Sequence, residues 1–267
     1  MGVGGGGMGA GASKPVIQGV ADVWNYSAGV APGLWVAIAG SNLSPFAQIA
    51  DFGARDTLPT ELGSVRVTFN GAPAALSYAG PTQINALAPK SIEAGPVNVV
   101  VEADGVASDA FAVTAKTTQP AIYAIPDVGG AVYSVTAALP GTGFLVGNRA
   151  VDSRVNRGAF PGETIDLYMV GMGATLDPAG FVTDRVFAAA YPIAAPATAR
   201  VGGLPARVIF AGLTSPGLYL VRMEVPPDVS PGNQPIEVSV GEAPASTTAP
   251  RLSLTVESRA AGLTTRP

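Results

Sequence analysis

Hydrophobic and polar residues alternate along much of this chain. In SVRVTF, the side chains of Val65, Val67 and Phe69 share one side and the polar residues between them share the other. Alternation with a period of two is the pattern of a half-buried β-strand. The same pattern recurs in PVNVVVE, DAFAVTA, TIDLYM, PATARV, ARVIFAG, YLVRMEV, PIEVSV and RLSLTV. Long helical periodicity is absent, and the prolines would interrupt most candidate helices. The sequence therefore predicts an all-β fold.

Tight turns separate several of these strands. Asn70-Gly71, Asp104-Gly105 and Gly202-Gly203 are residue pairs that readily adopt the positive φ angles of a two-residue hairpin. Pro73 follows the first of these turns and has no N–H to donate to a strand ladder. We therefore expect the strand that returns from this turn to begin at a sheet edge or a bulge.

The chain repeats itself. NGAPAALSYAG begins at residue 70 and GGLPARVIFAG begins at residue 202, and further blocks match in the same order: APG with FPG, WVAIAGSNL with TIDLYMVGM, PTQIN with SPGLY, and PVNVVV with QPIEVSV. This order predicts two homologous β-domains, joined near residues 119–126. Within the repeat, Tyr78 matches Phe210, and both are interpreted as core residues.

Each repeat has about 100 residues and about seven strands, which favours two antiparallel sheets packed face to face. The sequence therefore predicts two tandem immunoglobulin-like β-sandwich domains, without the cysteine pair of antibody domains. Their expected limits are 15–117 and 118–257. A flexible Gly-rich arm is expected at 1–14 and a flexible tail at 258–267.

The composition narrows the function. Charged residues make up 13% of the chain and the formal net charge is −4, so no basic stripe is available for nucleic acid. No apolar run is long enough to span a bilayer. The opening MGVGGGGMGAGASKP lacks the basic start and Leu-rich stretch of a signal peptide. The absence of Cys is compatible with a reducing compartment or with a bacterial surface.

Several stretches resemble a known family. VAPGLWVAIAGSNL, LPTELGSVRVTFNGAPAALSYAGPTQINALAP, FPGETIDLYMVGMG, GGLPARVIFAG and VPPDVSPGNQPIEVSV are similar to the tandem β-sandwich repeats at the C-termini of large exported proteins of Acidobacteria such as Solibacter, akin to IPT/TIG immunoglobulin-like domains. The resemblance covers most of residues 15–257. It implies the sandwich fold and an extracellular or cell-surface location, and it implies no activity.

The chemistry available to the chain is limited. Without His or Cys, the Ser-His-Asp and Cys-His triads and the usual zinc sites are excluded. The 19 acidic residues show no spacing of a calcium loop. We therefore predict no enzymatic activity, no catalytic residue, no cofactor and no metal. The alternative is a hydrolase with an unrecognised carboxylate pair, such as Asp166 with Glu224. That assignment requires the distance between the two carboxyl groups to be measured.

Two short motifs match functional patterns by spacing alone. Gly2-x-Gly4-x-x-Gly7 has the dinucleotide spacing but no strand before it and no helix after it. Asn25 and Asn42 each begin an N-glycosylation pattern, which in a bacterial chain we interpret as coincidence.

Exposed aromatic residues are the candidates for recognition, since aromatic faces bind the apolar surfaces of sugars. The set is Trp24, Tyr26, Trp35, Phe46, Tyr78, Tyr168 and Tyr191. Of these, Trp24, Tyr26 and Phe46 lie off the regular alternation and are the first candidates. No ligand-binding residue is assigned.

Together these features predict a non-enzymatic extracellular or cell-surface protein of bacteria with a structural or adhesive role. The expected partners are other proteins or further copies of the chain, with a polysaccharide as a further candidate. Because charge is sparse and the Gly-rich arm is long enough to reach a neighbour, a filament formed through open sheet edges is one hypothesis. A carbohydrate-binding module is the alternative from another class.

Overall fold

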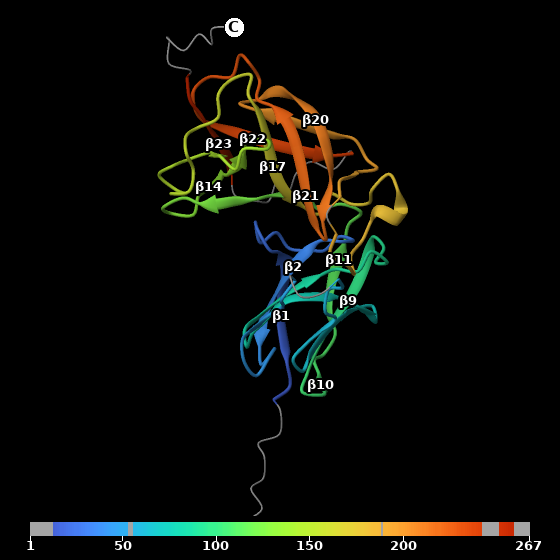
Figure 1. Ribbon diagram of the computed structural model, residues 1–267. Coiled ribbons are helices and arrows are strands. Elements are labelled where there is room, and N and C mark those ends of the chain that lie inside the picture. The colour runs from blue at the N-terminus through green and yellow to red at the C-terminus, as the bar shows by residue number, and fades with distance from the viewer. Residues whose placement is uncertain (1–12, 53–55, 188, 242–250, 259–267) are drawn as a thin grey trace, which may run out of the picture.

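The computed structural model describes residues 13–52, 56–187, 189–241 and 251–258. The chain folds into two β-structured halves that lie end to end, with the C-terminal half uppermost in Figure 1. Among the described residues the one helix is a short 3-10 turn, η1 (Pro178–Gly180). The all-β prediction is confirmed. The arm predicted at 1–14 and the tail at 258–267 lie almost wholly outside the described residues.

The N-terminal half holds two sheets. The first has the strand order β1-β2-β8-β7-β3, and the second the order β10-β9-β5-β4, with β11 paired to β9 and β6 paired to β5. Their bounds are β1 (Val16–Asp22), β2 (Trp35–Ser41), β3 (Gln48–Ile49), β4 (Glu61–Leu62), β5 (Val65–Phe69), β6 (Ala72–Pro73), β7 (Ala75–Ala79), β8 (Gln83–Leu87), β9 (Gly95–Ala103), β10 (Val106–Ala107) and β11 (Phe111–Ala115).

The C-terminal half holds one curled sheet, of order β13-β14-β23-β22-β19-β20-β21-β17-β15-β16, with β12 paired to β17 and β18 to β20. Its bounds are β12 (Ala121–Ile122), β13 (Ala124–Pro126), β14 (Val132–Val135), β15 (Ala137–Ala138), β16 (Leu145–Val146), β17 (Thr164–Val170), β18 (Tyr191–Pro192), β19 (Ala197–Val201), β20 (Leu204–Ser215), β21 (Leu218–Glu224), β22 (Gly232–Val240) and β23 (Arg251–Val256). The sheet curls because the long strand β20 pairs with β19 near its start and with β21 over the rest of its length.

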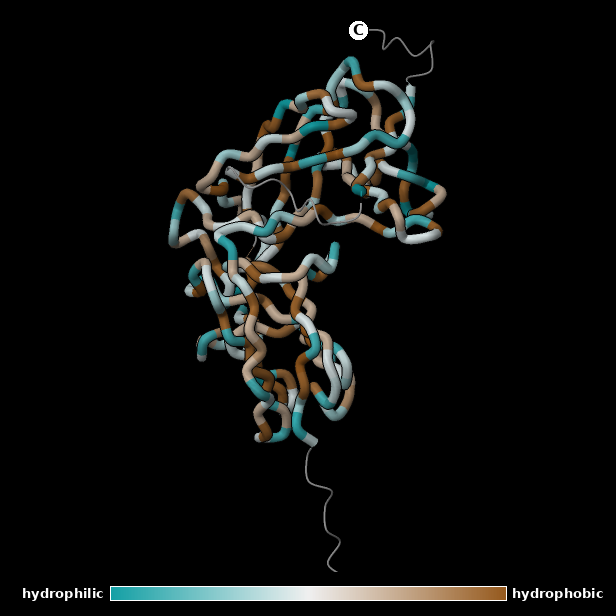
Figure 2. Tube along the Cα trace, turned by 180° about the vertical axis from the view of Figure 1, so that it is seen from behind, coloured by the Kyte–Doolittle hydropathy of each residue, from teal (hydrophilic) through white to brown (hydrophobic). Residues whose placement is uncertain are grey.

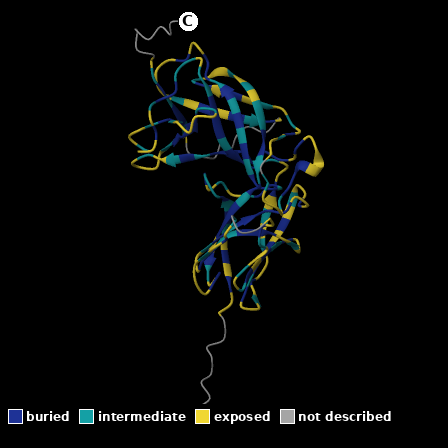
Figure 3. Cartoon of the chain, in the orientation of Figure 1, coloured by how far each residue is buried: buried dark blue, intermediate teal, exposed yellow. Residues whose placement is uncertain are grey.

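Each half has its own apolar interior, because the alternating residues of its strands point inward. One cluster gathers the inward residues of β1, β2, β5, β7, β8 and β9, and the other those of β17, β19, β21, β22 and β23. In Figure 2 the hydrophobic positions follow the strands inside both halves, and in Figure 3 the exposed residues concentrate in the loops. The domain limits between residues 117 and 118 stay a prediction.

The predicted hairpins are confirmed. Asn70 and Gly71 have φ angles of 48° and 81°, and Gly202 and Gly203 have φ angles of 61° and 78°. Pro73 lies in the edge strand β6, after which the chain crosses to the other sheet as β7, as its missing N–H requires.

Strand pairing is alike in the two halves. The order β2-β8-β7 has its counterpart in β17-β21-β20, and β5-β9-β11 in β19-β22-β23. One matched block was wrong by three residues: Asn85 pairs with Tyr78 as Arg222 pairs with Phe210, so PTQIN corresponds to residues 218–222 and not to SPGLY, because the β20–β21 hairpin is longer. A β-bulge falls between Leu76 and Tyr78 in one half and between Val208 and Phe210 in the other, the same 132 positions that separate the two hairpin turns.

The bulge corrects one sequence interpretation. Tyr78 and Phe210 were expected in the core, yet both are half-buried and neither belongs to an apolar cluster. Because a bulge places an extra residue on one strand, Tyr78 pairs with Asn85 and shares its side of the sheet instead of pointing inward. Its ring lies over Gly80, where a β-carbon would come within 2.4 Å of the phenol oxygen.

Candidate functional site

The two halves meet in a junction held by backbone hydrogen bonds. Leu58 N donates to Asp184 O at 3.0 Å, and Val186 N donates to Asp56 O at 2.9 Å. These bonds join the loop before β4 to the loop after η1 as a short ladder, with Thr57 opposite Arg185. Segments from both halves therefore share main-chain pairing, which a loose linker would not provide.

A second contact lies beside this ladder. The Trp35 indole Nε1, at the start of β2, donates to Pro216 O in the β20–β21 turn at 2.9 Å. Gly217 follows, with a φ of 69°, and a β-carbon there would come within 2.6 Å of both Trp35 and Leu87. The turn is thus closely packed against the end of the first sheet, and its glycine is required by both conformation and space.

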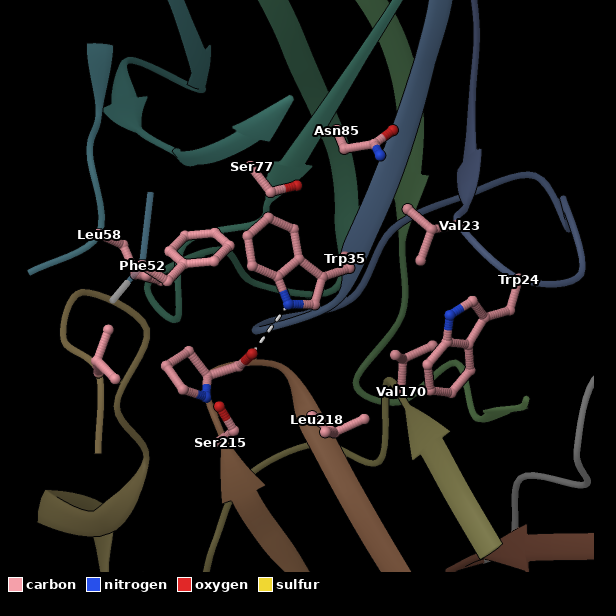
Figure 4. A pocket seen from close by; sticks show the side chains of 12 residues that line it. Val23, Trp24, Trp35, Phe52, Leu58, Ser77, Asn85, Val170, Ser215 and Leu218 are labelled. Atoms are coloured by element: carbon pink, nitrogen blue, oxygen red, sulfur yellow. Dashed lines mark hydrogen bonds between the residues drawn. The ribbon is translucent and has the colours of Figure 1, made fainter. Parts of the chain in front are cut away.

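A hollow of about 490 Å³ opens at this junction (Figure 4). Its size falls within the range of about 300–1,000 Å³ that is usual for small-molecule sites. Its lining is mostly apolar and comes from both halves: Val23, Trp24, Trp35, Phe52, Leu58, Ser77, Asn85, Val170, Val186, Ser215, Pro216 and Leu218. In Figure 4, Phe52 and Trp35 lie side by side, with ring centroids 6.3 Å apart in an edge-to-face arrangement.

A second hollow, of about 600 Å³, lies beside β1 and β11. It is lined by Gln18, Gly19, Val20, Ala21, Tyr26, Ala28, Gly29, Ala37, Ala39, Gln83, Phe111, Ala112, Val113, Thr114 and Lys116. Of the described residues that line the two hollows, Lys116 alone is charged.

One loop contributes an aromatic residue to each hollow. The fully buried Asp22 carboxylate accepts from the backbone N–H groups of Trp24, Asn25 and Ser27 at 2.6–2.9 Å. These bonds fix the turn after β1, in which Tyr26 has a φ of 55°. As a result, Trp24 lines the first hollow while Tyr26, 63% exposed, lines the second.

Replacing Asp22 by alanine should therefore lower the free energy of unfolding by about 2–3 kcal/mol, since three backbone donors lose their acceptor. Urea denaturation followed by tryptophan fluorescence measures this loss. Asp109→Ala is the control, because the Asp109 carboxylate is exposed and forms a surface ion pair with Lys14. Equal stability of the Asp22 and Asp109 variants would contradict the role given to the carboxylate.

The aromatic residues selected from the sequence divide between these sites and other places. Trp24 and Tyr26 line the hollows, and so does Trp35, which is half-buried. Phe46 is 59% exposed but lines neither hollow. Tyr191 packs against Phe187 in the C-terminal half, and Tyr168 lies on β17. Phe52, Asn85 and Ser77 were missed, because no local pattern marks them.

The two carboxylates of the alternative hydrolase site are each held by an arginine. Asp166 accepts two hydrogen bonds from Arg222, at 2.7 and 2.8 Å, and Glu224 accepts from Arg207 Nε at 3.0 Å. The bond to Asp166 raises the pKa of Arg222 above its ordinary value. Within the described residues, no group of three or more acidic side chains is arranged to hold a metal ion, and no helix is long and apolar enough to cross a membrane.

Comparison with known proteins gives no family. No family model matches the chain, and no curated protein matches it. One similar solved structure is SGBP-B of the Bacteroides ovatus mixed-linkage glucan utilization locus, in complex with a mixed-linkage heptasaccharide. It is 14% identical to this chain, with a TM-score of 0.33. The match covers 86% of this chain and 42% of SGBP-B. The chain thus spans less than half of that protein.

Two further structures match at similar levels. The full extracellular region of plexin A4 is 13% identical with a TM-score of 0.26, over 92% of this chain and 19% of plexin. Domains 5–6 of the S-layer protein SbsC are 12% identical with a TM-score of 0.24, over 92% of this chain and 100% of the other. These distant likenesses are to β-rich proteins, and at such TM-scores they assign no function to this chain.

Proposed function

We propose that this chain is a non-enzymatic extracellular structural or adhesive protein built from two tandem immunoglobulin-like β-sandwiches. The observation that carries the proposal is the junction, where the two halves share backbone hydrogen bonds and the Trp35–Pro216 contact. A structural or adhesive protein benefits from such a fixed arrangement. With a flexible hinge, the two domains would change their relative orientation under force or when a partner binds. The like pairing of strands in the two halves supports the tandem assignment.

The absence of enzymatic activity is part of the same proposal. It is supported by the lack of His and Cys and by the engagement of Asp166 and Glu224 with arginines. A hydrolytic activity that is lost in Asp166→Asn or Glu224→Gln, with folding retained, would contradict it.

Location is tested on intact cells that produce the chain naturally. An antibody against the purified chain should label them without permeabilisation. Labelling that appears only after the cells are broken open would contradict an extracellular role.

The hypothesis of a filament depends on the Gly-rich arm, which the structure does not describe. Light scattering on the full chain should show large assemblies, and a version that lacks residues 1–13 should show fewer. A strict monomer in the first case rules out the filament. Unchanged assemblies in the second case rule out the contribution of the arm.

A further inference from the structure

Strand register defines one outer face of the N-terminal half. Across the sheet β3-β7-β8-β2-β1, the partners Ile49, Tyr78, Asn85, Ala37 and Ala21 form a continuous row. On the central strands β8 and β2, the residues on either side of the row belong to the core: Ile84, Ala86, Val36 and Ile38. Because successive residues of a strand point to opposite faces, this row lies on the outside of the sheet.

Two parallel rows complete this outer face. Gln83, Ala39 and Gly19 form the row farther from the junction, and Ala75, Leu87 and Trp35 form the row at the junction. In the latter row Ala75 and Leu87 are buried beneath the junction, and Trp35 is half-buried. None of the residues in the three rows is charged. The small residues Ala37 and Ala39 lie at the centre of the face. The larger side chains around them are the indole of Trp35, the phenol of Tyr78 and the amides of Gln83 and Asn85.

The matching face of the C-terminal half is charged at equivalent places. The row Ala75–Leu87–Trp35 has its counterpart in Arg207–Glu224–Thr164. There, Arg207 and Glu224 form an ion pair.

The middle row differs in the same way. Asn85 and Ala37 pair in the N-terminal half where Arg222 and Asp166 pair in the C-terminal half. The ion pair found in one half is thus replaced by an amide and a methyl group in the other. Strand structure does not require the neutral middle row, because the same strand pairing accommodates charge in the second copy. In the row at the junction, by contrast, burial accounts for the neutral Ala75 and Leu87.

The outer surface of the second N-terminal sheet gives a further contrast. On that side, Arg66 of β5 binds Glu61 of β4 and contacts Glu102 of β9. Of the two outer faces of the N-terminal half, the neutral one is therefore the face that carries Trp35, Tyr78 and Asn85.

The neutral face borders both hollows and offers unused hydrogen-bonding groups. Trp35, Ser77 and Asn85 line the first hollow, and Ala37, Ala39 and Gln83 line the second. Asn85 Oδ1 accepts from Gln83 Nε2 at 2.7 Å, and no described residue accepts from Asn85 Nδ2. An amide fixed in this way presents its free N–H groups to whatever occupies the face.

We infer that this neutral face is the binding surface for an uncharged polysaccharide chain. Sugar rings have apolar faces that stack on aromatic side chains, and hydroxyl groups that bind amides and hydroxyls. An anionic polymer would find only Lys116 as a charged partner among the lining residues. The inference rests on the adhesive role proposed above and gives that role a partner.

Affinity electrophoresis through gels that contain glucan, galactomannan, xylan or dextran tests the inference, with polygalacturonate and hyaluronate as charged comparisons. At least one neutral polymer should retard the full chain. Tyr26 lines the second hollow beside the face, and Tyr26→Asn, which suits the positive φ, should weaken that binding at least about fivefold, as expected for the loss of an aromatic contact.

The double variant Ala37→Asp/Asn85→Arg copies the ion pair of the C-terminal half onto the neutral face. It should abolish retardation while the protein stays folded, which circular dichroism and thermal unfolding check. Phe46→Ala is the matched control, an exposed aromatic residue of the same half that lines neither hollow. It should bind as the wild type does.

Three results would overturn the inference: no neutral polymer retards the chain, a charged polymer retards it more strongly, or both face variants bind like the wild type. The proposed extracellular role would survive each of them, because surface labelling of intact cells tests it separately. A protein partner would then be sought.

Discussion

Replacing Gly171 by alanine should lower the free energy of unfolding by about 3 kcal/mol or more, and this change acts at the junction. Gly171 follows β17 and has a φ of 71°, which an alanine adopts only with strain. A β-carbon at this position would come within 2.1 Å of the Gln119 carbonyl oxygen. The Gln119 oxygen belongs to the backbone, so it cannot avoid the β-carbon by a side-chain rotation. The segment that connects the two halves must therefore move.

The movement has a second consequence. Gln119 N donates to Gly171 O at 2.8 Å, and the neighbouring Val170 packs into the apolar cluster of the N-terminal half. Displacing the connection therefore loosens the junction as well as the strand. Besides lower stability in urea denaturation, we expect small-angle X-ray scattering to show a broader distribution of distances than the wild type.

Gly71→Ala is the matched control. Gly71 also has a positive φ, of 81°, but a β-carbon there would meet nothing within 4 Å. It should cost only about 1 kcal/mol and leave the scattering unchanged. If the two alanine variants behave alike, the close approach at Gly171 does not hold the junction.

The hairpins were predictable because their information is local. Asn70-Gly71 and Gly202-Gly203 require positive φ angles, and few other residue pairs supply them. The alternating strands next to them were equally clear. In contrast, β12 to β16 are two to four residues long, too short for a period to be recognised.

The junction and its hollow were not predictable from local patterns. Trp35 and Pro216 are 181 positions apart, and no local sequence pattern around either residue predicts that they are in contact. The displacement of Tyr78 to the outer face was hidden for a related reason, because a bulge changes the face without changing the composition. The contrast between the two outer faces was hidden as well. The alignment of PTQIN with SPGLY places Asn85 opposite Tyr219, whereas strand register matches Asn85 with Arg222 and Leu87 with Glu224.

Tyr219→Phe should change how stability depends on alkaline pH. Tyr219 is fully buried in the C-terminal half, and its hydroxyl donates to Gly173 O at 2.6 Å. Loss of this bond should lower the free energy of unfolding by about 1–2 kcal/mol at neutral pH, since a buried carbonyl loses its donor. Gly173 lies against Thr118, so the bond also supports the connection between the halves.

Burial raises the pKa of Tyr219 above its ordinary value near 10, because the phenolate would be far from water. The neutral form is thus favoured by folding, and its contribution is complete below pH 10. Above that pH the unfolded chain releases a proton that the folded chain retains. The contribution then falls by about 1.4 kcal/mol for each pH unit, until the folded-state pKa is reached.

The phenylalanine variant has no phenol to titrate, so its stability does not fall in this way. The two curves of unfolding free energy should therefore converge above pH 10. They should cross about one pH unit higher, where the wild type has lost as much stability through ionisation as the variant lost with its hydrogen bond. Urea denaturation at pH 8, 10 and 11 measures both curves. Tyr26→Phe, which removes a hydroxyl from an exposed ring, serves as the control and should run parallel to the wild type. The contrary result is a difference in unfolding free energy between Tyr219→Phe and the wild type that stays constant from pH 8 to 11. It would show that the buried hydroxyl does not remain protonated in the folded state at high pH. The Tyr219–Gly173 bond would then not determine stability at alkaline pH.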